Sequence, residues 1–506
     1  MLMDYSRQIM RDAASECLLC TESACQKACP KGYATGDLLR SVRFKNEEVA
    51  AMNAGSTSIC AECSKECEKA CIRGKMDRPV NISGFMQSLG QLNKFQEKCT
   101  ADTDPDLSID FLGFKCINPF FLSSSVVGSN YEMISKAFDL GWGGVVYKTI
   151  TSFPHDEVSP RFDVVHDTPS SFIGFKNLEE SSEHTLEENK EIFRALKRDY
   201  PDRMLIASLM GMNDDDWTYL AKELTEAGAD ALELNFSCPH MAYDGLGSDV
   251  GVHPELVEQY VKAVRRGSSL PIIAKMTAQA TSIIPPAMAA IGAGADSLAA
   301  INTIKSILDV NIDDFSSGPD VAGKTAVGGL SGKSVKPLAL RSIYDMATYD
   351  KLHGVPLSGI GGIESWRDCL DFISLGCVNI QATTAIMQYG YRIITDIISG
   401  MKHFMQKKGI RHIDELVGCA LGNIVKPEEL NRHSIVYPKF LLNRCIECGR
   451  CVLSCYDGGH QALTMHDNGR ITMDPKKCVG CHLCLKVCPS DAIIEGPRIE
   501  RKKDII

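Results

Sequence analysis

Two dense groups of cysteines constrain this chain more than any other feature of its sequence. Of the 22 cysteines in 506 residues, eight fall between Cys17 and Cys71 and eight between Cys445 and Cys488. The opening residues MLMDYSRQIMRD place charges where a secretion signal would need an apolar run, so we expect a cytoplasmic protein whose thiols stay reduced. Dense, short spacings among reduced thiols indicate metal ligation rather than disulfide bonds.

The C-terminal group repeats the spacing C-x2-C-x2-C-x3-C twice. In this arrangement three thiolates on one tight loop bind three irons of a [4Fe–4S] cluster, and the fourth cysteine binds the other cluster. Two zinc sites are the alternative, but structural zinc sites usually pair C-x2-C units across a longer gap. We therefore predict two [4Fe–4S] clusters, one held by Cys445, Cys448, Cys451 and Cys488 and the other by Cys455, Cys478, Cys481 and Cys484.

The N-terminal group is spaced more loosely, as C-x2-C-x4-C-x3-C and C-x2-C-x3-C-x3-C. Residues 37–54 between the two halves have the apolar spacing of helices, which would brace the cysteine loops. We predict two further [4Fe–4S] clusters, with zinc as the alternative. Their ligands would come from Cys17, Cys20, Cys25, Cys29, Cys60, Cys63, Cys67 and Cys71.

Between Asn118 and Met405, short β-branched runs alternate with amphipathic helical stretches, which is typical of parallel βα units. Eight such units predict an α/β fold, a (β/α)8 TIM barrel. We place a helical iron–sulfur domain at 1–100, the barrel at 101–425 and a two-cluster ferredoxin-like domain at 426–506. The candidate strands are Pro119–Ser123, Gly144–Thr149, Leu205–Leu209, Ala231–Phe236, Ile272–Met276, Ser297–Asn302, Val355–Ile360 and Val378–Thr383.

Polar residues close the predicted strands, and in TIM barrels the active site lies at the carboxyl ends of the strands. Glycines and hydroxyls after the seventh and eighth strands, at Gly361-Gly362 and Thr383-Thr384, are typical of a phosphate cradle. We therefore expect a phosphorylated cofactor.

The composition disfavours two other classes of partner. The net charge of −10 disfavours binding to nucleic acid. No apolar run approaches the length of a membrane span, which is about 20 residues.

Five short motifs carry a family resemblance: KT at Lys148–Thr149, ELNFSCPH at Glu233–His240, AKMT at Ala274–Thr277, AINT at Ala300–Thr303 and GGLSG at Gly328–Gly332. With these motifs the chain resembles dihydropyrimidine dehydrogenase, which is similar in turn to dihydroorotate dehydrogenase. The resemblance implies iron–sulfur domains before and after an FMN barrel, so it covers nearly the whole chain. It also implies that FMN reduces the C5–C6 double bond of uracil or thymine.

The resemblance also implies residue roles, with Cys238 giving a proton to the carbon opposite hydride delivery. Asparagine amides match the donors and acceptors of a pyrimidine edge, and Lys275 suits the flavin N1/O2 end, where negative charge develops. FMN would contact Ser124, Lys148, Thr149, Lys275, Gly329, Gly361, Gly362, Thr383 and Thr384. The pyrimidine would contact Asn177, Glu179, Asn235, Ser237, Asn302 and Thr303.

Each role has a structural alternative. Asparagines at strand ends are common turn residues, lysines at a barrel rim can extend into solvent, and Cys238 could be an inert buried thiol. We expect the other scattered cysteines to be inert buried thiols: Cys99, Cys116, Cys369, Cys377 and Cys419.

The chain also departs from the family in ways that bear on electron supply. One N-terminal cluster of the family takes a glutamine ligand, but here Met86 stands at about that position with Gln87 beside it, so Cys60 is a candidate substitute. The FAD and NADPH domains are missing, since only about 30 residues, 81–110, join the N-terminal cysteines to the barrel. In this respect the chain resembles the FMN and iron–sulfur subunit of two-component enzymes.

A nicotinamide site is not visible in the sequence, because the glycine motif at Gly245–Gly251 has one residue too many for G-x-G-x-x-G. We therefore expect a separate NAD(P)H-oxidising flavoprotein or ferredoxin as electron donor, and a homodimer or hetero-oligomer. Two other functions stay open. One is action on dihydroorotate or another activated alkene, and the other is a non-catalytic electron-transfer subunit.

Overall fold

The structure is a computed structural model that describes residues 2–55, 57–95, 104–153, 156–168, 171–239, 241 and 245–500. The chain divides into two compact units, Leu2–Leu421 and Gly422–Ile506. Among the described residues, no helix combines the length and the apolar character that crossing a bilayer requires.

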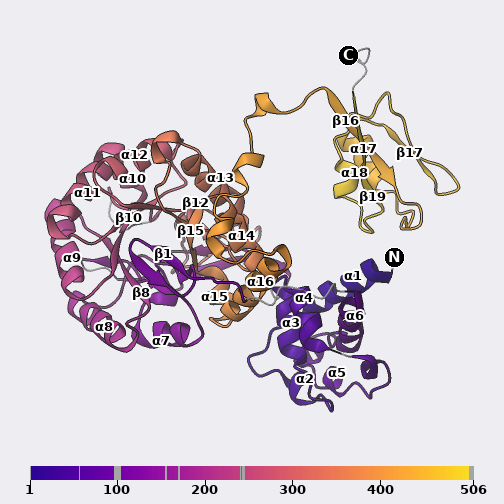
Figure 1. The fold of residues 1–506 in the computed structure, drawn as a ribbon, viewed down its shortest axis with the longest axis horizontal. Helices are drawn as coiled ribbons and strands as arrows, with labels where there is room; N and C mark the ends of the chain where they lie inside the picture. The colour runs from indigo at the N-terminus through magenta and orange to yellow at the C-terminus, as the bar shows by residue number, and fades with distance from the viewer. Residues whose placement is uncertain are drawn as a thin grey trace. The chain divides into compact units, whose positions relative to one another are not determined.

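Eight parallel strands close into a barrel in the first unit (Figure 1). Every residue of seven of these strands is buried, as expected where parallel strands are covered on both faces. Each strand overlaps one of the predicted strands, so the predicted (β/α)8 barrel is confirmed. In order around the barrel they are β3 (Phe120–Leu122), β4 (Gly144–Val146), β8 (Met204–Met210), β9 (Ala231–Asn235), β10 (Ile272–Met276), β11 (Ser297–Ala300), β14 (Leu357–Ile360) and β15 (Cys377–Ala382), which pairs with β3.

A ring of helices surrounds the barrel, as Figure 1 shows. Local sequence signals set where they begin: the Asn213 side chain caps α9 by accepting hydrogen bonds from the backbone N–H groups of Asp215 and Asp216, and Pro254 opens α11. The helices are α7 (Tyr131–Asp139), α8 (Leu186–Asp199), α9 (Asp214–Glu226), α11 (Pro254–Gly267), α12 (Ile284–Gly292), α13 (Lys336–Ala347), α14 (Trp366–Ser374) and α16 (Ile393–Lys408).

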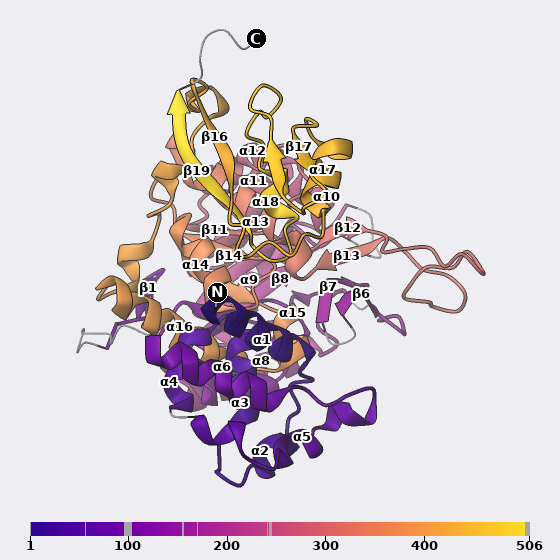
Figure 2. The same cartoon turned by 90° about the vertical axis from the view of Figure 1, so that its right-hand side faces the viewer.

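A second, antiparallel sheet stands beside the barrel and was not predicted from the sequence. Its strand order is β12-β13-β7-β6, and Figure 2 shows the four strands together on one side of the barrel. It places Phe162, Phe175, Asn177 and Ser331 against the barrel cavity. The strands are β6 (Phe162–Thr168), β7 (Ser171–Asn177), β12 (Ile304–Ser306) and β13 (Gly328–Ser331).

The N-terminal cysteines lie on a helical domain that packs on α16 of the barrel. Asp396 of α16 is buried, and it accepts hydrogen bonds from Arg40 Nε at 2.7 Å and Ser41 Oγ at 2.6 Å. Nearby, Glu48 pairs with His403 at 2.9 Å and Lys407 at 2.8 Å. These charged contacts fix the helical domain to the barrel. Its helices are α1 (Leu2–Glu16), α2 (Ala24–Lys27), α3 (Thr35–Arg43), α4 (Glu47–Ala54), α5 (Glu66–Lys69) and α6 (Ile82–Phe95).

The described part of the second unit has two antiparallel strand pairs and two helices, and its cysteines lie on the helices and in the loops that flank them. Its described core holds five buried residues, two of which are cysteines. A core of this size is small for independent stability, and metal ligation can supply what it lacks. The elements are β16 (Ser434–Phe440) with β19 (Ile493–Glu500), β17 (Leu463–Met465) with β18 (Ile471–Met473), α17 (Arg450–Gly458) and α18 (Leu483–Lys486).

Candidate functional site

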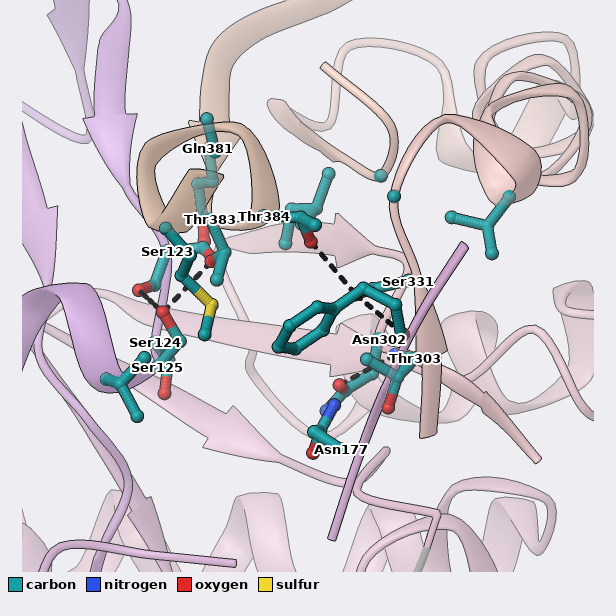
Figure 3. A pocket seen from close by; sticks show the side chains of 18 of the residues that line it. Ser123, Ser124, Ser125, Asn177, Asn302, Thr303, Ser331, Gln381, Thr383 and Thr384 are labelled. Carbon is teal, nitrogen blue, oxygen red and sulfur yellow. Dashed lines mark hydrogen bonds between the residues drawn. The ribbon is translucent and has the colours of Figure 1, made fainter. Parts of the chain in front are cut away.

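A cavity opens at the carboxyl ends of the barrel strands (Figure 3). It encloses about 1050 Å³ of space, part of it open to solvent, which is the size of a cofactor or ligand site. Its wall contains most of the predicted site residues: Ser124, Lys148, Thr149, Asn177, Glu179, Asn235, Cys238, Lys275, Asn302, Thr303, Gly361, Gly362, Thr383 and Thr384.

Two predicted residues, Ser237 and Gly329, lie behind the wall. The Ser237 hydroxyl is fully buried; it donates to Asn235 Oδ1 at 3.2 Å and accepts from Asn302 Nδ2 at 3.1 Å. The carbonyl of Gly329, on β13, accepts a hydrogen bond from Asn177 Nδ2 at 3.2 Å. Both residues therefore orient an asparagine of the wall.

Hydrogen bonds link the strand-end amides into one row. Asn302 Nδ2 donates to Asn235 Oδ1 at 3.3 Å, and Asn235 Nδ2 donates to Thr149 Oγ1 at 2.9 Å. Thr149 Oγ1 also lies 2.9 Å from Ser208 Oγ and 3.1 Å from Ser124 Oγ. Because each amide is fixed by its neighbour, the wall offers donors and acceptors in a set pattern.

The two lysines of the wall do not extend into solvent, because both are buried and paired with carboxylates. Lys148 contacts Glu179, and its Nζ lies 3.9 Å from Glu157. Lys275 Nζ lies 3.1 Å from a carboxylate oxygen of Glu233, whose side chain is fully buried. The alternative of solvent-exposed rim lysines is therefore wrong for both.

Glu233 and Gln381 belong to this array and were missed as site residues. Gln381 Nε2 donates to the second Glu233 oxygen and to Ser358 Oγ, each at 2.9 Å. The sequence did contain a signal for Glu233, because this charged residue stands between Leu232 and Leu234 in a buried strand. A buried carboxylate needs a partner, so its presence there indicates a polar array.

Serine and threonine hydroxyls and two glycines lie together at the ends of β14 and β15. Thr383 Oγ1 contacts Ser123 and lies 3.0 Å from Ser125 Oγ, and Ser331 Oγ lies 2.9 Å from Thr384 Oγ1 (Figure 3). Gly362 has φ +71°, and a Cβ there would lie 2.9 Å from the Gly332 carbonyl oxygen. Only glycine fits such a close approach to the protein, and Gly361 and Gly362 both line the cavity.

The residues present fit FMN. The hydroxyls and the bare main chain suit a phosphate group. Gln381 Oε1 is buried, lines the cavity and has no hydrogen-bond partner among the described residues, so it is an acceptor that a flavin edge could satisfy. The cavity therefore has polar groups for both ends of the cofactor.

Each C-terminal cysteine set lines its own cavity in the second unit. One cavity is lined by Cys445, Cys448, Cys451 and Cys488. The other is lined by Cys455, Cys478, Cys481 and Cys484. These are the two sets that the spacing assigns to separate clusters. Among the described residues, no group of three or more His, Cys, Asp or Glu side chains is arranged for a single metal ion.

The eight N-terminal cysteines form two sets of four, and the spacing alone did not assign cysteines to these sets. One cavity is lined by Cys17, Cys20, Cys25 and Cys71. The other four thiols influence one another: burial raises the pKa of Cys60 to about 11, and the nearby thiols of Cys63 and Cys29 add to the shift. Cys67 is affected in the same way by burial, Glu68, Cys29 and Cys63. Crowded thiols that resist ionisation alone can be deprotonated by a metal.

Comparison with known families agrees with this architecture. Residues 106–405 match the dihydroorotate dehydrogenase family, residues 441–495 a 4Fe-4S dicluster domain, and residues 2–98 the 4Fe-4S cluster domain II of dihydropyrimidine dehydrogenase. The chain belongs to the dihydroorotate dehydrogenase family. It is an oxidoreductase acting on CH–CH bonds, with FMN as the barrel cofactor and iron–sulfur domains at both ends.

Individual relatives show which members of the family the chain resembles. The Escherichia coli NAD-dependent dihydropyrimidine dehydrogenase subunit PreA is 53% identical over 77% of this chain and 95% of its own length. The chloroplastic dihydropyrimidine dehydrogenase (NADP(+)) of Arabidopsis thaliana is 35% identical over 63% of this chain and 78% of its own length. The catalytic subunit of dihydroorotate dehydrogenase B of Pyrococcus abyssi is 36% identical over 62% of this chain and 99% of its own length.

Proposed function

We propose that this chain catalyses flavin-dependent reduction of the C5–C6 double bond of uracil or thymine, or the reverse reaction. The observation that carries the proposal is the row of fixed amides in the same cavity wall as Cys238. A subunit that only transfers electrons does not need amide groups arranged to bind the edge of a pyrimidine. The names of the bacterial and plant relatives, both dihydropyrimidine dehydrogenases, support the same assignment.

When bound, FMN would supply the hydride for the substrate, and the iron–sulfur clusters would supply the electrons. Asn177, Asn235 and Asn302 hold the ring edge, and Thr303 completes the wall beside Asn302. The Cys238 thiol gives its proton to the ring carbon that does not receive hydride, and a proton from solvent restores the thiol. The balance is two electrons and two protons for each double bond reduced.

The cofactor site would use residues at opposite parts of the cavity. Lys275 would meet the flavin end where negative charge develops, with Lys148, Ser124 and Thr149 along the ring. Gly361, Gly362, Thr383 and Thr384 would meet the phosphate. Glu179 contacts Lys148, so its part in substrate binding would be indirect.

The charge of the cavity favours an uncharged pyrimidine over orotate. Among the described residues of the wall the cations are Lys148 and Lys275, and each is already paired with a carboxylate. Glu179, Glu180 and Glu364 also line the cavity. A substrate carboxylate needs a cation or a set of N–H donors, so orotate would meet net repulsion here.

Anaerobic flavin bleaching tests this function directly. Dihydrouracil, dihydrothymine and dihydroorotate are added in turn to the oxidised holoprotein, and the flavin absorbance near the visible maximum is followed. We expect bleaching with the first two and none with dihydroorotate. Bleaching by dihydroorotate alone would assign the chain to the other activity of its family.

For the clusters, we propose the cysteine sets that the structure brings together. Cys17, Cys20, Cys25 and Cys71 would bind one N-terminal [4Fe–4S] cluster. Cys29, Cys60, Cys63 and Cys67 would bind the other, so Cys60 takes the place of the glutamine ligand. Four clusters predict about sixteen iron atoms and as many acid-labile sulfides per chain. Zinc in place of half the iron would contradict the N-terminal assignment.

Electrons would come from a separate protein, either a NAD(P)H-oxidising flavoprotein or a ferredoxin, in a cytoplasmic homodimer or hetero-oligomer. The bacterial relative is named as an NAD-dependent subunit, which supports a partner for this chain as well. The isolated chain should be nearly inert with NADH or NADPH and active with reduced viologen. Rapid NADH oxidation by the chain alone would show that no partner is needed.

A further inference from the structure

The glycine motif at Gly245–Gly251 has no part in the function described so far. It resembles a dinucleotide-binding loop but has the wrong spacing. Gly245 has φ +77° and Gly247 has φ +56°, both in the left-handed region that favours glycine. Around them, Leu246, Ser248 and Val250 are buried, so the segment is packed against the protein rather than free to receive a phosphate.

The main chain of the motif packs against the main chain of Phe236–Cys238, the segment that follows β9. A Cβ on Gly247 would lie 2.3 Å from the carbonyl oxygen of Cys238, and a Cβ on Gly251 would lie 1.9 Å from the carbonyl oxygen of Phe236. The backbone N–H of Ser248 donates to the same Cys238 carbonyl at 2.8 Å. The contacts hold the chain on both sides of Ser237, which orients Asn235 and Asn302.

We propose that Gly247 is a positioning residue for Cys238. The atom that a larger residue would strike is a main-chain oxygen, which cannot rotate away as a side chain could. An alanine at 247 must therefore shift the backbone that carries the thiol. A displacement of about 1 Å in a reacting group can cost about a hundredfold in rate. The role in catalysis rests on the proposed function, in which the Cys238 thiol donates a proton.

Gly247→Ala and Gly245→Ala form a matched pair in the full-length holoprotein. Both positions have positive φ, so alanine is strained at each, but among the described residues no atom lies within 4 Å of a Cβ placed on Gly245. The first readout is the rate at which iodoacetamide alkylates Cys238, followed by mass spectrometry of its peptide. The second is kcat for uracil with reduced viologen, together with FMN content.

We expect Gly247→Ala to change the alkylation rate at least about tenfold and to lower kcat about 10- to 100-fold, because the thiol is displaced. Gly245→Ala should keep both values near wild type, with equal FMN content in the two variants. Equal alkylation rates and equal kcat in the two variants would overturn the proposal. Alkylation needs no pyrimidine turnover, so it decides the positioning role even if wild-type protein fails to reduce uracil or thymine.

A second variant covers the case in which Gly247→Ala does not fold. Ser248→Pro removes the N–H that donates to the Cys238 carbonyl, at the first residue of a helical turn, where proline is tolerated. We expect it to change the Cys238 alkylation rate at least about tenfold as well. A wild-type alkylation rate in Ser248→Pro would show that this contact does not position the thiol.

Discussion

Glu233 and Lys275 form an ion pair, with 3.1 Å between the carboxylate oxygen and Nζ, and both side chains are almost wholly buried. Gln381 donates to the second carboxylate oxygen at 2.9 Å. Glu233, on β9, therefore holds the ammonium that faces the cavity, and Gln381, on β15 across the barrel, holds the Glu233 carboxylate. Its charge is balanced before any ligand arrives.

Replacing Glu233 by glutamine should destabilise the barrel. The change keeps the size of the side chain but leaves the Lys275 ammonium buried without a counter-charge, at a cost of about 3 to 5 kcal/mol. The three tryptophans, Trp142, Trp217 and Trp366, all lie in the barrel, so their fluorescence during urea unfolding of the FMN-free protein reports on this part of the chain.

The double variant Glu233→Gln/Lys275→Met is the control for charge. Removing both members of a buried pair is often close to neutral, so the double variant should recover most of the lost free energy of unfolding. If it were as unstable as the single variant, the loss would come from packing rather than from the unpaired lysine.

The barrel could be predicted from the sequence because buried parallel strands appear as short apolar runs, each followed by an amphipathic helix. β10 has the predicted bounds, Ile272–Met276. The antiparallel sheet could not be predicted in this way. Its strand β13 reads GGLS, which has little β-propensity, and it pairs with β7 from far away in the sequence. That pairing decides where Asn177 and Gly329 lie.

The site was predictable where strand-end residues face the cavity and unpredictable where partners come from several strands. Asn235 is the last residue of β9 and Asn302 lies two residues after the end of β11, so the barrel geometry brings them together. The contacts of Glu233 with Lys275 and Gln381 depend on the register between strands, which the sequence does not show. The N-terminal ligand sets depend in the same way on how two loops fold together.

The scattered cysteines give a test by pH. Cys116, Cys369 and Cys377 are buried as predicted, but Cys419 is exposed, so the prediction is wrong there, and Cys99 lies outside the described residues. Burial raises the pKa of Cys116 from 9.0 to about 12. Iodoacetamide at pH 8 should label Cys419 and leave Cys116 unlabelled unless the protein is unfolded.

The same shift predicts how Cys116 affects stability. In the unfolded chain its thiol ionises near pH 9.0, whereas in the folded barrel it stays protonated to about pH 12. Its contribution is therefore complete below pH 9 and is lost as the pH rises toward 12. Cys116→Ala should therefore make the free energy of unfolding decline less between pH 9 and pH 12 than it does in the wild type. If the decline is unchanged, it comes from other titrating groups.

Replacing Cys238 by alanine should leave FMN bound and slow pyrimidine reduction by about 10² to 10⁴, which is the usual contribution of a positioned general acid. Serine should be nearly as damaging at neutral pH, since a hydroxyl is a far poorer proton donor than a thiol near its pKa. Turnover with uracil and reduced viologen measures both. Normal turnover in the alanine variant would remove the thiol from the mechanism.

The last prediction separates the two candidates for the fourth ligand of the second N-terminal cluster. Cys60 is buried beside Cys63 and Cys29, whereas Gln87 lies on α6 and is only half-buried. Cys60→Ser should therefore destabilise one of four clusters and lower iron by up to about a quarter. Gln87→Ala is the matched control and should keep the full iron content. Iron analysis with low-temperature EPR of the reduced protein distinguishes them, because loss of a cluster signal in Gln87→Ala but not in Cys60→Ser would assign the ligand to glutamine.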